Sequence, residues 1–427
     1  MKPVTLLSAA LLSAFATVAA AAPYCDAMNA KDTLPSKYQK RGPFYSDAAS
    51  GWIIGDDQMR GTFKVSGEAR ALWSDIRDEF AAQGVTLTVM VAPPRPLFAP
   101  ADVRAAMGKA DYDADAAATA FKGYIAGLNE AGIAAPDLLS ASSAAERPYY
   151  FQRDTHWTPS GAALSAKALA EAIGLATDAA APDYSATYDE KGSLSMVAKA
   201  ACGVRPSPET VAAPDYAKAG GASALLGDAT GPALALVGTS FSDRYQRDAY
   251  RVADAIAHYT GASVENFSVS GGGVTAAMEA FIRSGRMAEF ETVVWEAPYT
   301  EPLTNISALR QILGALISRR SKGDAAEQVV ELGSDWISVA PKIELENSQA
   351  IEVRIAGVAT GQLDVELYDA DNKKTRIQLR KSDRVDAGLR SDIWSVALSE
   401  INPAAIARIK LRLNGASKGA VASLRAL

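Results

Sequence analysis

Histidine is rare in this chain of 427 residues, which contains only His156 and His258. The imidazole ring titrates near neutrality, so histidine is the side chain best suited to move protons at neutral pH. His156 lies in the stretch "RDTHWTPSGA", two positions after Asp154 and directly before a predicted helix. An Asp-x-His pair at the start of a helix could be a catalytic acid–base pair, one corner of a metal site or an ordinary polar loop.

A candidate nucleophile, Ser240, follows later in the chain. The apolar stretch "ALALVG" (233–238) predicts a strand that runs into "TSFSDRY", and we expect a helix over 243–261 behind it. A serine between a strand and a helix is raised above the carboxyl end of a sheet, and the helix directs N–H groups toward it. The segment "GTSFS" lacks the second glycine of the G-x-S-x-G motif, so a simple N-cap is the alternative role for Ser240.

His156 is the better candidate for the base that would activate this serine, because His258 is expected inside the following helix as a packed or surface residue. Asp154 could orient His156 and stabilise its protonated form, as in a Ser-His-Asp triad. A metal site would need more ligands than one histidine and one carboxylate, and the sequence has no Cys/His cluster. We therefore predict neither a metal nor a cofactor.

The N-terminal residues predict export. Residues 1–21 combine a positive charge, a short apolar run and small residues, as in a secretory signal peptide cleaved after Ala21. A transmembrane anchor is the alternative, but the apolar run is short and rich in alanine. We expect a periplasmic protein.

The chain contains two cysteines, Cys25 and Cys202. An oxidising compartment favours a disulfide between them. Two unrelated buried thiols are the alternative.

Hydrophobic periodicity divides the chain near residue 323. Before it, helical and strand patterns alternate, which predicts an α/β domain (22–323) with a parallel sheet flanked by helices. After it, short alternating segments separated by Gly, Asn and Asp predict an all-β sandwich (324–427). The segments expected as strands of this sandwich are 336–340, 342–346, 350–357, 362–370, 375–381, 393–401 and 407–415.

The motif "DTHWTPSGA" followed by "ALVGTSFSDRY" resembles the periplasmic alginate O-acetyltransferases. Their acetyltransferase domain has an SGNH-hydrolase-like fold, in which the Asp-x-His pair precedes the serine. The resemblance covers much of residues 24–320 and includes "GWIIG" (51–55). It implies that Ser240 accepts the acetyl group, that His156 is the general base and that Asp154 orients it.

The resemblance also implies residues that line the site. Tyr245 falls near an aromatic position that the family uses there. Gly271 and Gly272, in "SGGGV", fall where such enzymes present an oxyanion-hole glycine, with a flexible turn as the alternative. In "WEAPYTEP" the glutamate and proline of the family's Glu-x-Pro-x-Arg motif are kept, but Thr300 replaces the arginine, which leaves the substrate contacts open.

The implied activity is transfer of an acetyl group, through an acetyl-serine, onto hydroxyl groups of alginate or a related exported polymer of uronic acids. The resemblance further implies a membrane-bound O-acyltransferase as the acetyl donor and other polysaccharide export proteins as partners. It also implies that the β-sandwich is a carbohydrate-binding module. An acetylesterase and a non-catalytic polysaccharide-binding component of an export complex are the alternatives.

The formal net charge of −6 argues against nucleic acid as a partner. Basic residues nevertheless gather around the proposed triad and in the segment 372–384. The residues that we expect to bind an anionic polymer are Arg153, Arg244, Lys373, Lys374, Arg376, Arg380 and Lys381. For 372–384 the alternative is a solvated edge strand protected by lysines. Trp336 and Trp394 could stack on sugar rings or pack in the core.

Overall fold

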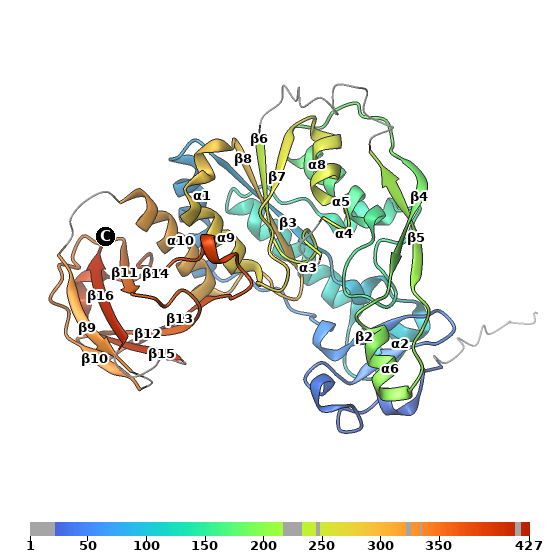
Figure 1. Cartoon of the computed structure of the whole chain (residues 1–427), viewed down its shortest axis with the longest axis horizontal. Coiled ribbons are helices and arrows are strands. Elements are labelled where there is room, and N and C mark those ends of the chain that lie inside the picture. Colours follow the sequence, from blue (N-terminus) through green and yellow to red (C-terminus); the bar gives the residue numbers. More distant parts are fainter. Residues whose placement is uncertain (1–21, 217–232, 245–247, 322–325, 334, 415–419) are drawn as a thin grey trace, which may run out of the picture.

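The computed structural model describes residues 22–216, 233–244, 248–321, 326–333, 335–414 and 420–427 (Figure 1). The predicted signal peptide, 1–21, and Tyr245 lie outside these residues. The larger part of the molecule contains helices around a parallel sheet, and strands β9 to β16 form a second part at one end (Figure 1). The α/β domain followed by an all-β domain, predicted from the sequence, is confirmed.

The parallel sheet has the strand order β3-β8-β6-β7, and its neighbouring strands all run parallel. The strands are β3 (Thr86–Ala92), β8 (Thr292–Pro298), β6 (Ala233–Val237) and β7 (Ser263–Asn266). Along β8, Val293 and Trp295 pack into one hydrophobic cluster, whereas Val294 packs into another on the opposite face. Burial on both faces is typical of parallel sheets and explains why β8 reads as a continuous apolar run.

Helices cover both faces of this sheet. Residues of α1 (Gly67–Ala81), α3 (Ala114–Glu130), α9 (Val274–Ser284) and α10 (Ile306–Arg320) contribute to one cluster. Residues of α2 (Ala101–Gly108), α5 (Pro159–Ala172) and α8 (Val252–Thr260) contribute to the other. The remaining elements include α4 (Leu138–Ala141), α6 (Ser195–Cys202), β1 (Phe44–Ser46), β2 (Ile53–Gly55), β4 (Asp183–Glu190) and β5 (Glu209–Asp215). In the described part of the chain, no helix has the length and apolar character needed to cross a bilayer.

The helix expected over 243–261 begins later than predicted, because α8 starts at Val252 and the described residues before it, 243–244 and 248–251, are not helical. Directly after Ser240 the chain forms a tight turn instead, in which the N–H groups of Ser242 and Asp243 both donate to the Thr239 carbonyl. The carboxylate of Asp248 accepts the N–H groups of the first two residues of α8, at 2.7 and 2.8 Å, and so fixes where the helix starts. The N-terminus of α8 therefore does not directly follow the serine.

The second part consists of two antiparallel sheets with the orders β10-β15-β12-β13 and β14-β11-β16-β9. Their strands are β9 (Gln328–Leu332), β10 (Ile337–Val339), β11 (Ala350–Ile355), β12 (Gly361–Asp369), β13 (Lys374–Lys381), β14 (Ile393–Ala397), β15 (Ile406–Asn414) and β16 (Ala420–Ala426). The strand expected over 342–346 is wrong. Its two apolar residues, Ile343 and Leu345, are buried in the sandwich core, but the segment pairs with no strand in the described structure.

The two parts are packed together through α10. Arg310 of this helix is buried and donates to the carbonyls of Ala397 (2.9 Å) and Ser399 (2.6 Å), next to strand β14. Gly314, one helical turn later, faces the backbone of β14 so closely that a Cβ atom would lie 2.8 Å from the Ser395 carbonyl carbon. The sandwich is thus fitted against a helix of the α/β domain.

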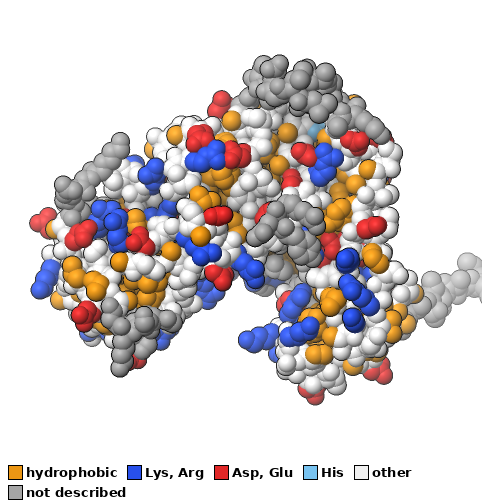
Figure 2. Space-filling model, in the orientation of Figure 1, with side chains coloured by type: hydrophobic (Ala, Val, Ile, Leu, Met, Phe, Trp, Pro, Cys, Tyr) orange, Lys and Arg blue, Asp and Glu red, His pale blue; other side chains and the backbone are white. Residues whose placement is uncertain are grey.

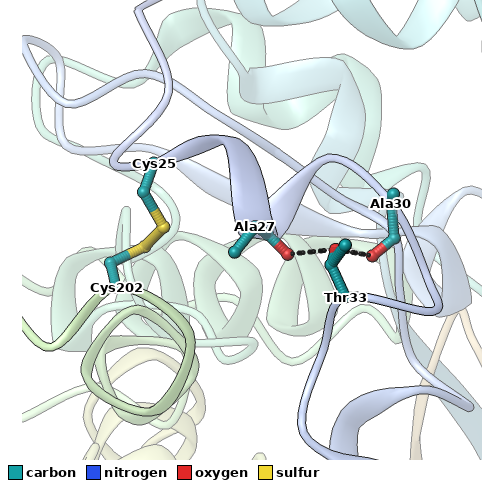
Figure 3. Close-up of a disulfide and its surroundings, with 5 residues drawn as sticks. All are labelled: Cys25, Ala27, Ala30, Thr33 and Cys202. Atoms are coloured by element: carbon teal, nitrogen blue, oxygen red, sulfur yellow. Dashed lines mark hydrogen bonds between the residues drawn. A yellow bond between two sulfur atoms is a disulfide. The ribbon is translucent and has the colours of Figure 1, made fainter.

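The predicted disulfide between Cys25 and Cys202 is confirmed, with the two Cα atoms 5.7 Å apart (Figure 3). It links the N-terminal segment to the end of α6. Beside it, the Thr33 hydroxyl donates to the carbonyls of Ala27 and Ala30 and closes the turn that follows Cys25 (Figure 3). The bridge spans 177 residues, so it removes many conformations from the unfolded chain.

The close approach at Gly314 predicts the effect of adding a single methyl group. Gly314→Ala should lower the free energy of unfolding by about 2 kcal/mol or more, because the backbone of β14 must move away. The matched control is Gly123→Ala in α3, where nothing lies within 4 Å of the added carbon. This control should instead raise stability by about 0.5–1 kcal/mol through helix propensity. Urea unfolding of both variants tests this, and equal effects of the two substitutions would contradict the packing argument.

Candidate active site

The structure brings together Ser240, His156 and Asp154. The His156 Nε2 atom lies 2.8 Å from the Ser240 Oγ atom, and its Nδ1 atom forms a short hydrogen bond with the Asp154 carboxylate. Asp154 is fully buried, and His156 is 5% exposed. The order carboxylate, imidazole, hydroxyl is the geometry in which histidine can take the serine proton while the carboxylate holds the ring.

A narrow hairpin presents the Asp-x-His pair. Tyr150 and Trp157 form an antiparallel bridge, and the Phe151 N–H donates to the carbonyl of His156. The buried guanidinium of Arg95 binds this hairpin to β2, since it donates to the carbonyls of Phe151, Gln152 and Ile53. The "GWIIG" segment, which includes β2, therefore supports the hairpin from behind.

Asp154 has four donors around its two carboxylate oxygens. One oxygen binds the His156 ring and the His156 N–H, and the other accepts the Ser193 N–H at 2.6 Å and the Arg244 Nη2 group at 2.9 Å. Burial alone would raise the pKa of this carboxyl. The charges and hydrogen bonds of His156, Arg244 and Ser193 outweigh burial and hold the pKa of Asp154 well below its usual range. Asp154 is therefore ionised and fixed in direction.

A second buried carboxylate, Glu296 of β8, lies beneath the turn that carries Ser240. It accepts the Thr239 N–H at 2.7 Å and the Thr239 hydroxyl at 3.0 Å. A Cβ atom at Gly238 would lie only 2.4 Å from the Glu296 Oε2 atom, so the close approach of this backbone to the carboxylate requires glycine. Burial raises the pKa of Glu296 to about 7, although the hydrogen bonds from Thr239 act in the opposite direction.

Aromatic rings enclose His156. The ring centroids of Phe241 and Tyr250 lie 4.7 and 5.8 Å from the centroid of the imidazole. The Trp157 indole N–H donates to the Phe241 carbonyl, which connects the hairpin to the serine turn. His258, as expected, lies in α8 away from this site, with its Nε2 atom 2.9 Å from the Ala180 carbonyl oxygen.

Three basic residues expected to bind the polymer face inward instead. Arg244 is 7% exposed and pairs with Asp154, so it belongs to the support of the triad. The side chain of Lys381 is buried beside Glu279, at 3.3 Å, and donates to the carbonyls of Ser391 and Ile393 at the start of β14. Arg153 is mostly covered and lies 3.7 Å from Glu209. Each of these three residues forms an ion pair inside the protein, so its charge is already partly neutralised.

Gly271 and Gly272 lie at the entrance to α9, and the structure shows neither of them in contact with Ser240. Gly271 has a φ of +73° and faces Arg384 of the sandwich. Gly272 lines a cleft of about 1230 Å³ between the two domains. The loop that follows β8, with Thr300 and Glu301, lines the same cleft. Thr300, which stands where the Glu-x-Pro-x-Arg motif has arginine, therefore lies on a wall of this cleft.

The sandwich side of the cleft is polar. Its lining residues from the sandwich include Gln362, Gln378, Arg380 and Asn414. The adjoining outer face of the same sheet carries Arg376 and Arg412, whose guanidinium groups lie 5.9 and 4.8 Å from the ring centroid of Trp336. Lys373 and Lys374 are exposed at the start of β13. Trp394 is fully buried, so it is a core residue.

Sequence reasoning missed Arg95, Glu190 and Glu296 as supports of the site. Only Glu296 carried a signal, because it is the glutamate of the Glu-x-Pro-x-Arg motif that "WEAPYTEP" resembles. Within the described ranges, no group of three or more His, Cys, Asp or Glu side chains is arranged to hold a metal ion.

A serine after the central strand β6 of a parallel sheet, facing an Asp-x-His hairpin, is the arrangement of an SGNH hydrolase-like domain. Comparison with protein families agrees with this class. Residues 50–299 match the family described as SGNH hydrolase-like domain, acetyltransferase AlgX, and the chain belongs to this family.

The sequence identity to individual relatives is low. The chain is 27% identical over 359 residues to the alginate biosynthesis protein AlgX of Pseudomonas aeruginosa, which covers 78% of this chain and 73% of that protein. It is 26% identical over 267 residues to the probable alginate O-acetylase AlgJ of Pseudomonas putida, covering 58% of this chain and 67% of that protein. The solved structure of Pseudomonas aeruginosa AlgX aligns with 94% of this chain and 99% of its own, with a TM-score of 0.69 at 23% identity, which confirms the shared fold.

The raised pKa of Glu296 predicts that the protein becomes less stable as the pH rises. The carboxyl binds a proton more tightly in the folded than in the unfolded protein, so its stabilising contribution is full at low pH and is lost as the pH rises through about 7. Glu296→Gln keeps an oxygen for the Thr239 N–H but does not titrate. Between about pH 5 and pH 8, the variant should gain up to about 3 kcal/mol of stability relative to the wild type. Urea unfolding across this range measures the difference, and parallel pH profiles would contradict it.

Proposed function

We propose that this protein is a periplasmic O-acetyltransferase that moves an acetyl group through Ser240 onto hydroxyl groups of an exported uronic-acid polysaccharide, alginate or a related polymer. The observation that carries the proposal is the hydrogen-bonded chain from Asp154 through His156 to Ser240. Membership in an acetyltransferase family and the names of the AlgX and AlgJ relatives support the same reaction and substrate class.

In the first half-reaction, the Ser240 Oγ atom attacks the carbonyl carbon of an acetyl donor while His156 Nε2 takes the serine proton. His156 then gives this proton to the leaving group, and an acetyl-serine remains. In the second half-reaction, a sugar hydroxyl attacks the acetyl-serine as His156 takes its proton, which finally returns to Ser240. Asp154 keeps the ring oriented in both steps and stabilises the imidazolium that forms.

The negative oxygen of the tetrahedral intermediate needs hydrogen-bond donors. Within the described chain, no protein acceptor takes the backbone N–H of Ser240, which leaves this group available. Of the two glycines expected to supply a second donor, Gly271 is our candidate, because the Gly272 N–H already donates to the Val269 carbonyl at 3.2 Å.

The interdomain cleft is our candidate path for the polymer. It has glycine-loop and β8-loop residues on one wall and sandwich residues, including Arg380, on the other. Lys and Arg side chains gather on both sides of the hollow between the sandwich and the N-terminal segment (Figure 2). Exposed guanidinium and ammonium groups suit the carboxylates of a uronate chain. We assign residues 324–427 as its carbohydrate-binding module on this basis.

The cellular context follows from the same proposal. Residues 1–21 would direct export, and the Cys25–Cys202 disulfide suits an oxidising compartment. A membrane-bound O-acyltransferase would supply the acetyl group, and other export proteins would deliver the polymer.

The direct test incubates the purified protein with an activated acetyl ester and a mannuronate oligomer. An acetyl adduct on Ser240 by intact mass, and a mass gain on the oligomer, are the expected results. Ester hydrolysis with no acetylated sugar would identify an acetylesterase. Absence of both the adduct and turnover would leave a polysaccharide-binding component of an export complex.

Substitutions in the triad should not cost activity independently, because its members act as a unit. Ser240→Ala, His156→Ala and Asp154→Asn should each lower kcat by a factor of about 10³ or more, and the double variant of His156 and Asp154 should be little worse than the worse single variant. Asparagine is used at 154 because alanine would leave the buried Arg244 guanidinium without this partner. Acetyl-ester turnover and melting temperature are measured on the same samples. An active but destabilised His156→Ala protein would end the triad hypothesis.

The proposed polymer path predicts charge-dependent binding. Arg380→Gln and Arg376→Gln should each weaken binding of a mannuronate oligomer about five- to tenfold, and the salt dependence of binding should become shallower. The matched control is Lys122→Gln, an exposed lysine of α3 outside the cleft lining. Calorimetric titration at two salt concentrations measures these effects. Equal affinities for all three variants and the wild type would exclude this path.

A further inference from the structure

Behind the catalytic pair, Arg244 reaches from the serine turn to two carboxylates at once. Its Nη2 atom lies 2.9 Å from Asp154 Oδ2 and 3.5 Å from Glu190 Oε1. All three side chains are buried, with 7%, 0% and 4% exposure for Arg244, Asp154 and Glu190. Glu190 is the last residue of β4, and it also accepts the Gly192 N–H at 3.0 Å and the Tyr250 hydroxyl at 3.3 Å.

The charges of this cluster bear on the protonation of His156. A guanidinium beside Asp154 alone would cancel the negative charge that stabilises an imidazolium. Glu190 restores that charge, because two carboxylates against one guanidinium leave a single negative charge when the ring is neutral. Protonation of His156 then makes the buried group neutral as a whole. In surroundings that exclude water, a neutral protonated state costs far less than one with an excess positive charge.

We propose that Arg244 and Glu190 are positioning residues for the His156–Asp154 pair: Arg244 fixes the carboxylate that holds the ring, and Glu190 offsets the charge of Arg244 so that the protonated ring is stabilised. This inference deepens the proposed function, since it concerns the base of that reaction. It assigns a role to a glutamate that contacts neither Ser240 nor His156 in the structure.

The other described polar groups around the ring are the same in every variant. Tyr250 is a phenol whose pKa is raised by burial, so it stays neutral. On the far side of the hairpin backbone, Arg95 and Arg153 face Glu209, which accepts the N–H groups of Gln152 and Arg153. These groups are unchanged when Glu190 or Arg244 is substituted, so they contribute equally to every variant.

The chain offers a direct measurement because it contains only two histidines. Full-length protein labelled with ¹³C at the imidazole Cε1 position gives one NMR signal for His156 and one for His258. In Glu190→Gln the His156 signal should change at lower pH than in the wild type, because a negative charge is removed. In Arg244→Gln it should change at higher pH, because a positive charge is removed. The His258 signal should titrate identically in all proteins and serves as the internal reference.

The matched control is Glu279→Gln, which also neutralises a buried glutamate paired with an arginine, Arg283, but at the domain interface. This control should lower stability without moving the titration of His156. Opposite shifts in the Glu190 and Arg244 variants cannot arise from loosened packing alone, which would act in the same direction in both. Shifts of the same sign, or no shift in Glu190→Gln, would overturn the inference. If Arg244→Gln does not fold, Glu190→Gln decides the matter alone.

Turnover provides a second readout. The acid limb of the kcat/KM profile for acetyl-ester hydrolysis should move to lower pH in Glu190→Gln, and kcat should fall about tenfold with little change in KM, because the imidazolium forms only during the reaction. These measurements distinguish a failure of the proposed function from a failure of the inference about Arg244 and Glu190. A wild-type protein without turnover would refute the proposed function while the NMR titration still tests the cluster. Normal turnover with an unmoved His156 titration would refute only the cluster.

Discussion

The buried carboxylate of Asp154 is the interaction on which the site depends. It joins three segments that are far apart in sequence: its own hairpin through His156, the chain after β4 through the Ser193 N–H, and the serine turn through Arg244. A buried negative charge is tolerated only with such partners, because each donor replaces water that the fold has removed. Once these donors are in place, the carboxylate cannot rotate, and the imidazole that it holds has one direction, toward Ser240.

The serine turn is held by the same kind of arrangement. Glu296, in the carboxyl half of the inner strand β8, accepts the Thr239 N–H, and β8 lies directly beside β6, the other inner strand, which ends in this turn. The carboxyl end of a parallel sheet thus presents the candidate nucleophile, Ser240, after one strand and its anchor, Glu296, on the neighbouring strand. His156 lies on a different structure, the hairpin before α5, and Arg95, Asp154 and the Trp157 indole hold that hairpin against the sheet layer, which places the ring beside Ser240. The site therefore forms where two loops come into contact, the serine turn and the Asp-x-His hairpin, and each loop has its own supporting contacts.

Sequence periodicity predicted the elements whose apolar faces are continuous, such as β3, β8 and α10, because their side chains report burial directly. It failed where a polar contact sets the structure. Asp248 starts α8 later than the pattern indicated, and the alternating "KIELE" buries two residues without pairing as a strand. The candidate triad could be located because histidine is rare and its neighbours are distinctive. The inward orientation of Arg244 could not be predicted, because the sequence does not show that this arginine pairs with a carboxylate 90 positions away. Lys381 was expected on the surface for the same reason, but it pairs with the buried Glu279.

The fit between α10 and the sandwich bears on how such a protein can be recombined. Many domains are joined to their neighbours by a flexible linker, so they can be exchanged between unrelated proteins. Here Ala350 and Ala397 of the sandwich belong to the same buried cluster as α1 and α10, and Gly314 leaves room for a neighbouring backbone rather than for solvent. A chimera that kept the α/β part and received a foreign module would expose an apolar helix face and a buried arginine. The two parts must therefore be engineered as one unit.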